Sequence, residues 1–102
     1  MAHLMAQFDV WRTTGGDLVI DCQSDLLTHL NTRFVVPLLR ADAFEVVARR
    51  LNPLFTVEDM EYVMYTQFAA AIPASQLDER IMTLDDRNFT ITGALDVLLT
   101  GV

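Results

Sequence analysis

The sequence contains little of what metalloproteins and disulfide-stabilised proteins require. It has one cysteine, Cys22, so no internal disulfide can form, and only two histidines, His3 and His29. A metal site in a protein needs several convergent Cys, His or carboxylate ligands, and no spacing of these residues here provides them. We therefore expect no metal, and no other cofactor.

Catalytic motifs are also scarce. The glycine pair Gly15-Gly16 lies outside any GxGxxG or GxxxxGK[ST] frame, so a turn is the better interpretation than a phosphate-binding loop. Cys22 lies in a predicted strand, where a small buried hydrophobe is expected rather than a nucleophile. The acidic residues from Glu58 to Glu61 fall in a predicted turn and are expected to be solvated. The sequence thus predicts a protein that is not an enzyme.

Long apolar runs are missing as well. The longest, Phe34 to Leu39 and Phe68 to Ile72, fall far short of the roughly 20 residues of a membrane-spanning helix. The N-terminus lacks the basic segment and apolar block of a secretory signal, so we expect a cytoplasmic protein with no membrane partner. Residues 1–5 fit no strand pattern and are expected to be a leader or a cloning remnant, with Met1 or Met5 as the native start. A single domain is expected over residues 6–102.

Positive charge is scarce, with 7 basic against 14 acidic residues and a net charge of −7. Binding to phosphate backbones depends on Lys and Arg, so direct binding of DNA or RNA is disfavoured. Apolar side chains are abundant, at 52% of the chain with a mean hydropathy of +0.30. In a chain of 102 residues this indicates that apolar surface is buried against a second copy, and it predicts a homodimer.

The first half of the chain follows a β pattern. Residues 7–12 alternate apolar and polar side chains, and the cluster Thr13–Asp17 supplies a tight turn before a second strand over Leu18–Cys22. A further strand is expected over Arg33–Leu39. Because Pro37 cannot donate a ladder hydrogen bond, we expect that strand to bulge at Pro37 or to lie at a sheet edge from that point on.

A helical spacing follows this strand. Asp42 and Glu45 resemble a capping box, and the apolar residues Phe44, Val47, Ala48 and Leu51 fall at i, i+3, i+4 and i+7. The pattern predicts a short helix that runs up to Asn52-Pro53. Three more short strands are expected over Leu54–Val57, Tyr62–Thr66 and Ile72–Ser75.

The last element is predicted to be a helix. One of its faces carries Ile91, Ala94, Leu95, Leu98 and Val102. Asp85 is expected to be its N-cap, with the pair Asp85-Asp86 at the positive end of the helix dipole. Several strands that close on themselves with a terminal helix packed across them predict a mainly β fold, a small SH3-like barrel.

The predicted helix ends in the apolar run Leu98-Leu99-Thr100-Gly101-Val102, at a terminus that would ordinarily fray. Such side chains are either buried in a dimer or offered to a partner. The composition leaves both interpretations open.

Six short segments match a known family in order and spacing. They are Gln7-Phe8-Asp9-Val10, Ile20–Leu27 with its Gln-Ser-Asp sequence, Arg33–Leu38, Asn52-Pro53-Leu54, Ile72–Ser75 and the terminal Gly101-Val102, with all three prolines in their family positions. Through these segments the chain resembles the CcdB toxins of bacterial toxin-antitoxin systems. The resemblance runs from about Ala6 to Val102.

The resemblance implies a homodimeric SH3-like barrel that is a toxin and not an enzyme. Such a toxin binds the A subunit of DNA gyrase and traps gyrase on cleaved DNA. A CcdA-like antitoxin neutralises it, and the two together repress their own operon, so DNA is contacted only through the antitoxin complex. Carried over position by position, the gyrase-binding residues would be Leu26, Leu27, Asp96, Leu99, Thr100, Gly101 and Val102.

The chain departs from the family at one of these positions. The best-known members end in Trp-Gly-Ile, where the Trp stacks on an arginine of gyrase, whereas this chain ends in Thr100-Gly101-Val102. An aromatic-cation contact is worth roughly 0.5 to 2 kcal/mol, so its loss is expected to weaken binding by about 2- to 30-fold. Without the resemblance, Leu26 and Leu27 would be interpreted as ordinary core residues.

Two alternatives stay open. The MazF endoribonucleases share the CcdB fold, and Arg33 with Thr32 is the pair of residue types that could cleave RNA, although the acidic net charge argues against RNA binding. The other alternative is a degenerate relative that still binds an antitoxin but no longer harms gyrase.

Overall fold

The computed structural model describes residues 5–102, and these form one antiparallel sheet and one α-helix. The elements are β1 (Asp9–Thr13), β2 (Leu18–Asp21), β3 (Thr32–Arg40), β4 (Leu54–Val57), β5 (Met60–Met64), β6 (Ala70–Pro73), β7 (Leu77–Thr83) and α1 (Asn88–Thr100). Short 3-10 turns occupy Asp25–Leu27, Thr66–Phe68, Ala74–Gln76 and Asp85–Arg87. The first four residues of the expected leader lie outside the described residues.

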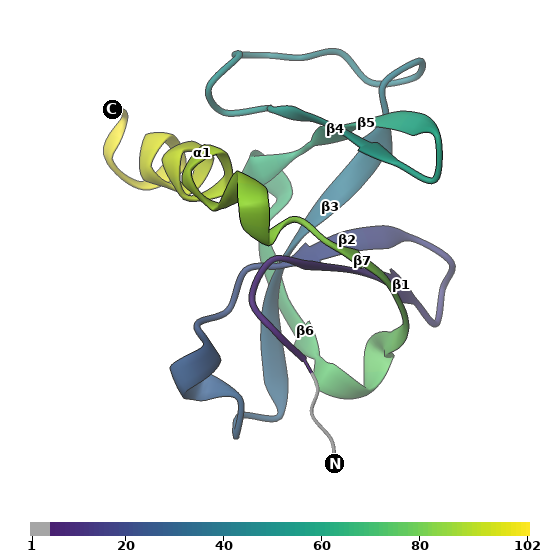
Figure 1. The fold of residues 1–102 in the computed structure, drawn as a ribbon. Coiled ribbons are helices and arrows are strands. Elements are labelled where there is room, and N and C mark those ends of the chain that lie inside the picture. Colours follow the sequence, from purple (N-terminus) through teal and green to yellow (C-terminus); the bar gives the residue numbers. More distant parts are fainter. Residues whose placement is uncertain (1–4) are drawn as a thin grey trace.

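The strands follow the order β4-β5-β3-β2-β1-β7, and β6 pairs with β3 beside this path. β3 is the longest strand at nine residues, with β2 on one side and β6 followed by β5 on the other. Figure 1 shows the sheet curling round, with α1 lying to one side and the C-terminus projecting from it. The prediction of a mainly β, barrel-like fold with a C-terminal helix is confirmed.

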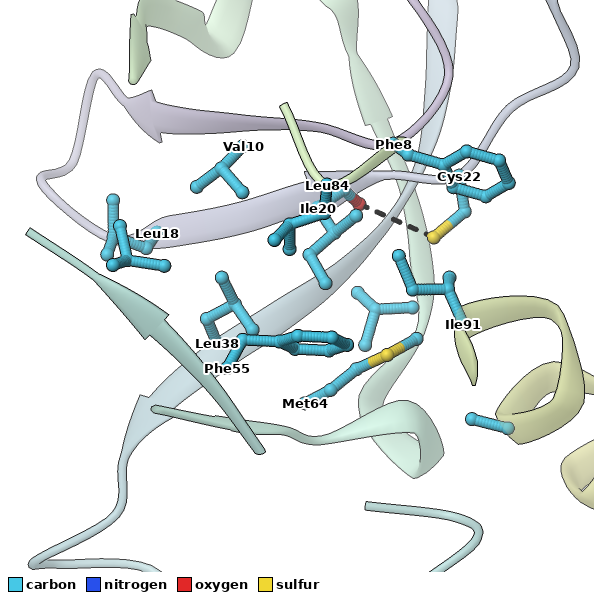
Figure 2. Packing of buried hydrophobic residues seen from close by; sticks show 13 residues of the cluster. Phe8, Val10, Leu18, Ile20, Cys22, Leu38, Phe55, Met64, Leu84 and Ile91 are labelled. Atoms are coloured by element: carbon cyan, nitrogen blue, oxygen red, sulfur yellow. Dashed lines mark hydrogen bonds between the residues drawn. The ribbon is translucent and has the colours of Figure 1, made fainter. Parts of the chain in front are cut away.

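The concave side of the sheet encloses the main core (Figure 2), which strands β1 to β5 and α1 all supply. Its buried members are Phe8, Val10, Leu18, Ile20, Cys22, Val36, Leu38, Phe55, Val57, Met64, Leu84, Ile91 and Ala94. The apolar face predicted for the last helix therefore docks through Ile91 and Ala94, with Leu95 partly buried against them. Leu98 and Val102, the other two residues of that face, are exposed.

A smaller apolar cluster covers the opposite face of the same strands. Because successive side chains of a strand point to opposite faces, the neighbours of the main-core residues form it. Trp11, Val19, Val35 and Leu77 are its buried members, and Met5 and Ile72 pack against it. Strands β1 to β3 consequently carry buried apolar side chains on both faces.

The prediction of a helix from Asp42 to Asn52-Pro53 is wrong. Residues 41–53 form irregular turns, and the carboxylate of Asp42 pairs with Arg40 at 2.7 Å. The apolar side chains of the helical pattern, such as Phe44 and Val47, are exposed. An isolated helix this short is marginal in water, so without a buried face nothing stabilises it.

A buried amide takes the place of helical bonding in this loop. The Oδ1 atom of Asn52 accepts hydrogen bonds from the amides of Val47 and Ala48 at 3.0 and 3.4 Å. Its Nδ2 group donates to the carbonyl of Met64 at 3.0 Å. The loop is therefore tied to the end of β5 by one side chain, which hydropathy spacing does not reveal.

The prediction that β3 bulges at Pro37, or lies at a sheet edge from that point on, is also wrong. β3 passes through Pro37 without a bulge, since its register with β2 is continuous from Leu18↔Leu38 to Asp21↔Val35. On the other side of β3, pairing with β6 ends at Val35 and pairing with β5 begins at Leu38. Pro37 thus occupies the gap between two partner strands, where no ladder donor is required, and its carbonyl accepts from the amide of Tyr65 at 3.0 Å.

The start of α1 differs from the prediction too. A 3-10 turn, Asp85–Arg87, leads into the helix, and Arg87 is the N-cap residue without a side-chain bond to the helix. The amide of Asp85 donates to the hydroxyl of Thr83 at 3.2 Å, so Asp85 is not the N-cap. Asp85 and Asp86 do lie in the first turn of the 3-10 segment.

Strand β7 was not predicted, because the charged run from Asp78 to Arg80 interrupts its apolar alternation. The structure explains these charges through the pairing of β7 with β1. The guanidinium of Arg80 binds the buried carboxylate of Asp9, with 2.9 Å between Nε and Oδ2. The strand predicted over Ile72–Ser75 is present as β6, displaced towards the N-terminus.

Candidate protein-binding site

The C-terminal end of α1 is built around a left-handed glycine. Gly101 has φ of +80°, and its amide donates to the carbonyl of Val97 at 2.8 Å. Glycine adopts this conformation without the clash that a Cβ would cause. The hydroxyl of Thr100 donates to the carbonyl of Asp96 at 2.7 Å. The helix is therefore capped to its last turn, and residues 96–102, here named the C-terminal tip, have a defined shape.

Two apolar side chains of the C-terminal tip are largely exposed in the subunit. Leu99 is 78% exposed and Val102 is 74% exposed. Asp96, Thr100 and Gly101 are exposed as well. Figure 1 shows the chain end clear of the sheet. Because burial of apolar surface is favourable by about 25 cal/mol per Å², this tip is suited to a contact with another protein or another subunit.

Leu26 and Leu27 lie on a 3-10 turn between β2 and β3. Leu26 is 87% exposed and Leu27 is 43% exposed, so neither is a core residue. The hydroxyl of Ser24 accepts from the amide of Leu26 at 3.1 Å, which caps the turn. We name Ser24–Leu27 the leucine turn. Its two side chains are presented to solvent on a capped backbone.

The turn is also tied to the sheet by a residue that the sequence analysis did not assign. Gln23 is buried, its Oε1 atom accepts from the amide of Phe34 in β3, and its Nε2 group donates to the carbonyl of Leu27, both at 2.9 Å. In the sequence, Gln23 stands out only as part of the Gln-Ser-Asp segment. Hydropathy alone assigns these polar residues to the surface, so it does not reveal that Gln23 is buried.

A buried ion pair lies under this part of the sheet. The Nη2 and Nε atoms of Arg33 are 2.7 and 2.9 Å from Oδ2 of Asp21, and both side chains are buried. Burial raises the pKa of the Asp21 carboxyl from 3.8, while the hydrogen bond from Arg33 acts in the opposite direction. Arg33 is only 1% exposed, so it cannot reach an RNA phosphate while the chain is folded.

Cys22 is the small buried hydrophobe that the sequence predicted. Its thiol donates to the carbonyl of Ile20 at 3.7 Å, as Figure 2 shows. Burial raises the pKa of this thiol to about 12, and the nearby charge of Asp21 acts in the same direction. A thiol with this pKa is almost entirely protonated at neutral pH, which is the opposite of what a nucleophile needs.

Other candidates for chemistry are ordinary surface groups. The acidic residues from Glu58 to Glu61 lie in and beside the β4–β5 turn, where Glu58 binds Arg12 at 2.8 Å. Across residues 5–102, no three His, Cys, Asp or Glu side chains converge as ligands of a metal ion would. Within the same residues, no helix combines the length and apolarity needed to cross a bilayer.

The structure places the seven predicted contact residues in two patches of one subunit. Five of them share the C-terminal tip, and Leu26 and Leu27 share the leucine turn. In Figure 1 both patches lie on the same side of the molecule, the tip at the upper left and the turn at the lower left. Phe89, at the other end of α1, is a further exposed apolar side chain, 89% exposed, that does not belong to either patch.

These features define a class: a small, mainly β domain whose exposed apolar tip suits protein binding. A family model described as CcdB protein matches residues 7–101. The chain therefore belongs to the CcdB family, which confirms the resemblance carried by the six segments. Membership supports a toxin of a toxin-antitoxin system, in a family of gyrase poisons rather than enzymes.

Proposed function

We propose that this protein is a toxin that poisons DNA gyrase by binding its A subunit. The contact is made by Leu26, Leu27, Asp96, Leu99, Thr100, Gly101 and Val102. The active form is a cytoplasmic homodimer of the 6–102 domain. A CcdA-like antitoxin neutralises it, and the complex of the two represses their operon.

One observation carries this proposal. The C-terminal tip has a capped backbone yet leaves Leu99 and Val102 largely exposed. Exposed apolar side chains on an ordered backbone bind with little loss of conformational entropy, because their backbone does not have to be ordered first. The net charge of −7 also suits a toxin that adheres to gyrase rather than to DNA.

The endoribonuclease alternative has no support in the geometry. Its candidate cation, Arg33, is buried and neutralised by Asp21, so the pair Arg33 and Thr32 cannot hold a phosphate. Cleavage of RNA would require an exposed cation near the attacking group. The degenerate relative differs from the proposed toxin only in what it binds, so an experiment separates the two.

The test measures binding of the purified protein to the gyrase A subunit by calorimetry. Gly101→Arg is expected to weaken binding by more than about 10-fold, because a long side chain is placed in the middle of the contact. Gly16→Arg is the matched control, since Gly16 and Gly101 both have positive φ, +91° and +80°, and both have open space where a Cβ would lie. The two variants should lose similar stability, and only Gly101→Arg should lose binding.

Two outcomes decide between the proposed toxin and the degenerate relative. Growth arrest on expression, together with a binding loss specific to Gly101→Arg, supports the proposal. Normal growth, with antitoxin binding intact and no gyrase binding, identifies the degenerate relative instead.

Thr100→Trp restores the aromatic ring of the best-known members and is expected to tighten gyrase binding by about 2- to 30-fold.

A further inference from the structure

The leucine turn is exposed at its side chains but anchored at its backbone. The amide of Leu27 donates to the carbonyl of Ser24 at 3.0 Å, and the carboxylate of Asp25 accepts from the amide of Gln7 at 2.8 Å. These bonds shape the turn and tie its start to the N-terminal segment. They do not link its far end, Leu27, to the sheet.

Gln23 makes that link. Its Oε1 atom is fixed by the amide of Phe34, a residue of β3 whose carbonyl also accepts from the amide of Cys22 at 2.8 Å. Its Nε2 group holds the carbonyl of Leu27, which receives a second bond from the amide of Leu30 at 3.2 Å. One buried amide thus joins a central strand to the last residue of the leucine turn.

The backbone of Gln23 is also hydrogen-bonded, to the buried carboxylate of Asp21. Its amide donates to Oδ1 of Asp21 at 3.1 Å, while Oδ2 of the same carboxylate binds Arg33. Asp21 and Arg33 belong to β2 and β3, so the bridge rests on paired strands. Because its side-chain amide is buried and bonded at both ends, Gln23 cannot shift without breaking a hydrogen bond at one of them.

We infer that Gln23 is a positioning residue for partner binding, which sets Leu26 and Leu27 at a fixed height above the sheet. The inference rests on the proposed function, because it takes the leucine turn to be part of the gyrase contact. Gln23 itself touches no partner, since it is buried. Its contribution is to hold the turn in the binding conformation before the partner arrives, which reduces the entropic cost of binding.

The substitution Gln23→Glu tests the positioning role, because it should break the bridge at high pH and restore it at low pH. A carboxylate at this position still accepts from Phe34 but repels the carbonyl of Leu27, so the turn is released. Once protonated, the same carboxyl can donate to that carbonyl and restore the bridge. Burial raises the pKa of a glutamate above its ordinary value of about 4.3, so the switch is reached in mildly acidic buffer.

At pH 8, Gln23→Glu is expected to bind the gyrase A subunit about 10-fold more weakly than the wild type and to exchange the amides of residues 26–30 about 10-fold faster. At pH 5 both deficits should shrink towards the wild-type values. Calorimetry gives the affinity, and hydrogen exchange read by mass spectrometry or NMR gives the protection. Gln23→Met, which cannot titrate, should keep its deficit at both pH values.

The bridge has other ionisable neighbours, with Asp21 and Arg33 beneath it and Asp25 and His29 in the same loop. The wild type and Gln23→Met carry all of them, so their pH profiles remove that contribution. Asn52→Asp is the matched control for a buried amide changed to an acid, because Asn52 ties the 41–53 loop to Met64 in the same manner. It should lose stability but keep wild-type exchange in residues 26–30.

The outcomes separate this inference from the proposed function. Wild-type affinity and protection of Gln23→Glu at pH 8, or a deficit that pH does not relieve, would overturn the positioning role. Failure of the wild type to bind gyrase would overturn the proposed function, while the exchange data would still show whether Gln23 holds the turn.

Discussion

Two buried amides, Gln23 and Asn52, shape the two longest loops of this molecule. Each accepts from a backbone amide at one end and donates to a backbone carbonyl at the other. A buried amide left without partners costs several kcal/mol, about 1–3 for each unsatisfied group. Both residues therefore act as specific ties, and their loops have defined shapes without forming an α-helix or a strand.

Cys22 carries a prediction at the scale of a single side chain. Burial raises the pKa of its thiol from 9.0 to about 12 in the folded state. The folded protein therefore retains this proton where the unfolded chain releases it. The resulting stability is fully present below pH 9, and it falls as pH rises from 9 towards 12, by about 1.4 kcal/mol per pH unit.

Urea unfolding of the wild type and of Cys22→Ala between pH 8 and 11 measures this effect. Cys22→Ala should be less stable at pH 8, because it leaves a small cavity, and the gap between the two proteins should close as pH rises. The other ionisable groups are common to both proteins, so their contribution cancels in the difference. A gap that stays constant with pH would show that the thiol is not the group responsible.

At the scale of elements, the β4–β5 hairpin has an unusual turn. Glu58 and Asp59 form its two-residue loop, since Val57 pairs with Met60, and their φ angles are +52° and +66°. Turns with two positive φ angles match the twist of paired strands, and they favour Asn and Gly at these positions. Neither residue here is glycine, so the hairpin retains some backbone strain.

Asp59→Gly is therefore expected to stabilise the protein by about 0.5–1 kcal/mol, because relief of the left-handed strain exceeds the added entropy of the unfolded chain. The midpoint of urea unfolding measures this change. Asp59→Ala, which removes the carboxylate but keeps a Cβ, should give no such gain. Equal effects from the two variants would assign the change to charge rather than to backbone conformation.

Sequence patterns predicted the elements that have a one-sided apolar face or a turn signal. The β1–β2 hairpin, β3, β4 and α1 are of this kind. They failed where a polar side chain decides the structure: the 41–53 loop, which Asn52 holds, and β7, where Arg80 binds Asp9 of β1. The site residues came from resemblance to the family. The patterns alone assigned Leu26 and Leu27 to the core, and only the structure shows that Gln23 joins β3 to the carbonyl of Leu27.

At the scale of the whole molecule, apolar surface remains exposed on the subunit. The exposed large apolar side chains include Phe34, Phe44, Val47, Phe68, Phe89, Leu98 and Leu99. Patches of this kind on a soluble protein mark surfaces for other chains. Leu98 lies on the same helix face as the buried Ile91, so a second copy that packs along α1 would extend the core across the interface.

We predict a homodimer that forms through the face of α1 that carries Leu98. Analytical ultracentrifugation at micromolar concentration should give twice the 11.5 kDa mass of the chain. Leu98→Glu should weaken the dimer by about 10-fold or more, because a charge is buried at the interface. Thr90→Glu, an exposed position in the first turn of α1, should leave it intact. A dimer unaffected by Leu98→Glu would place the interface elsewhere on the subunit.

The pairing of β1 with β7 has a consequence for biosynthesis. Asp9 lies opposite Thr83, so β1, the first strand of the chain, cannot pair with β7, the last strand, until both have been synthesised. Contacts between such distant residues make folding slow. On the ribosome, the sheet stays incomplete until β7 has emerged, and α1 follows directly. The chain therefore completes its sheet and its C-terminal tip almost together, and a translation product truncated before β7 has neither.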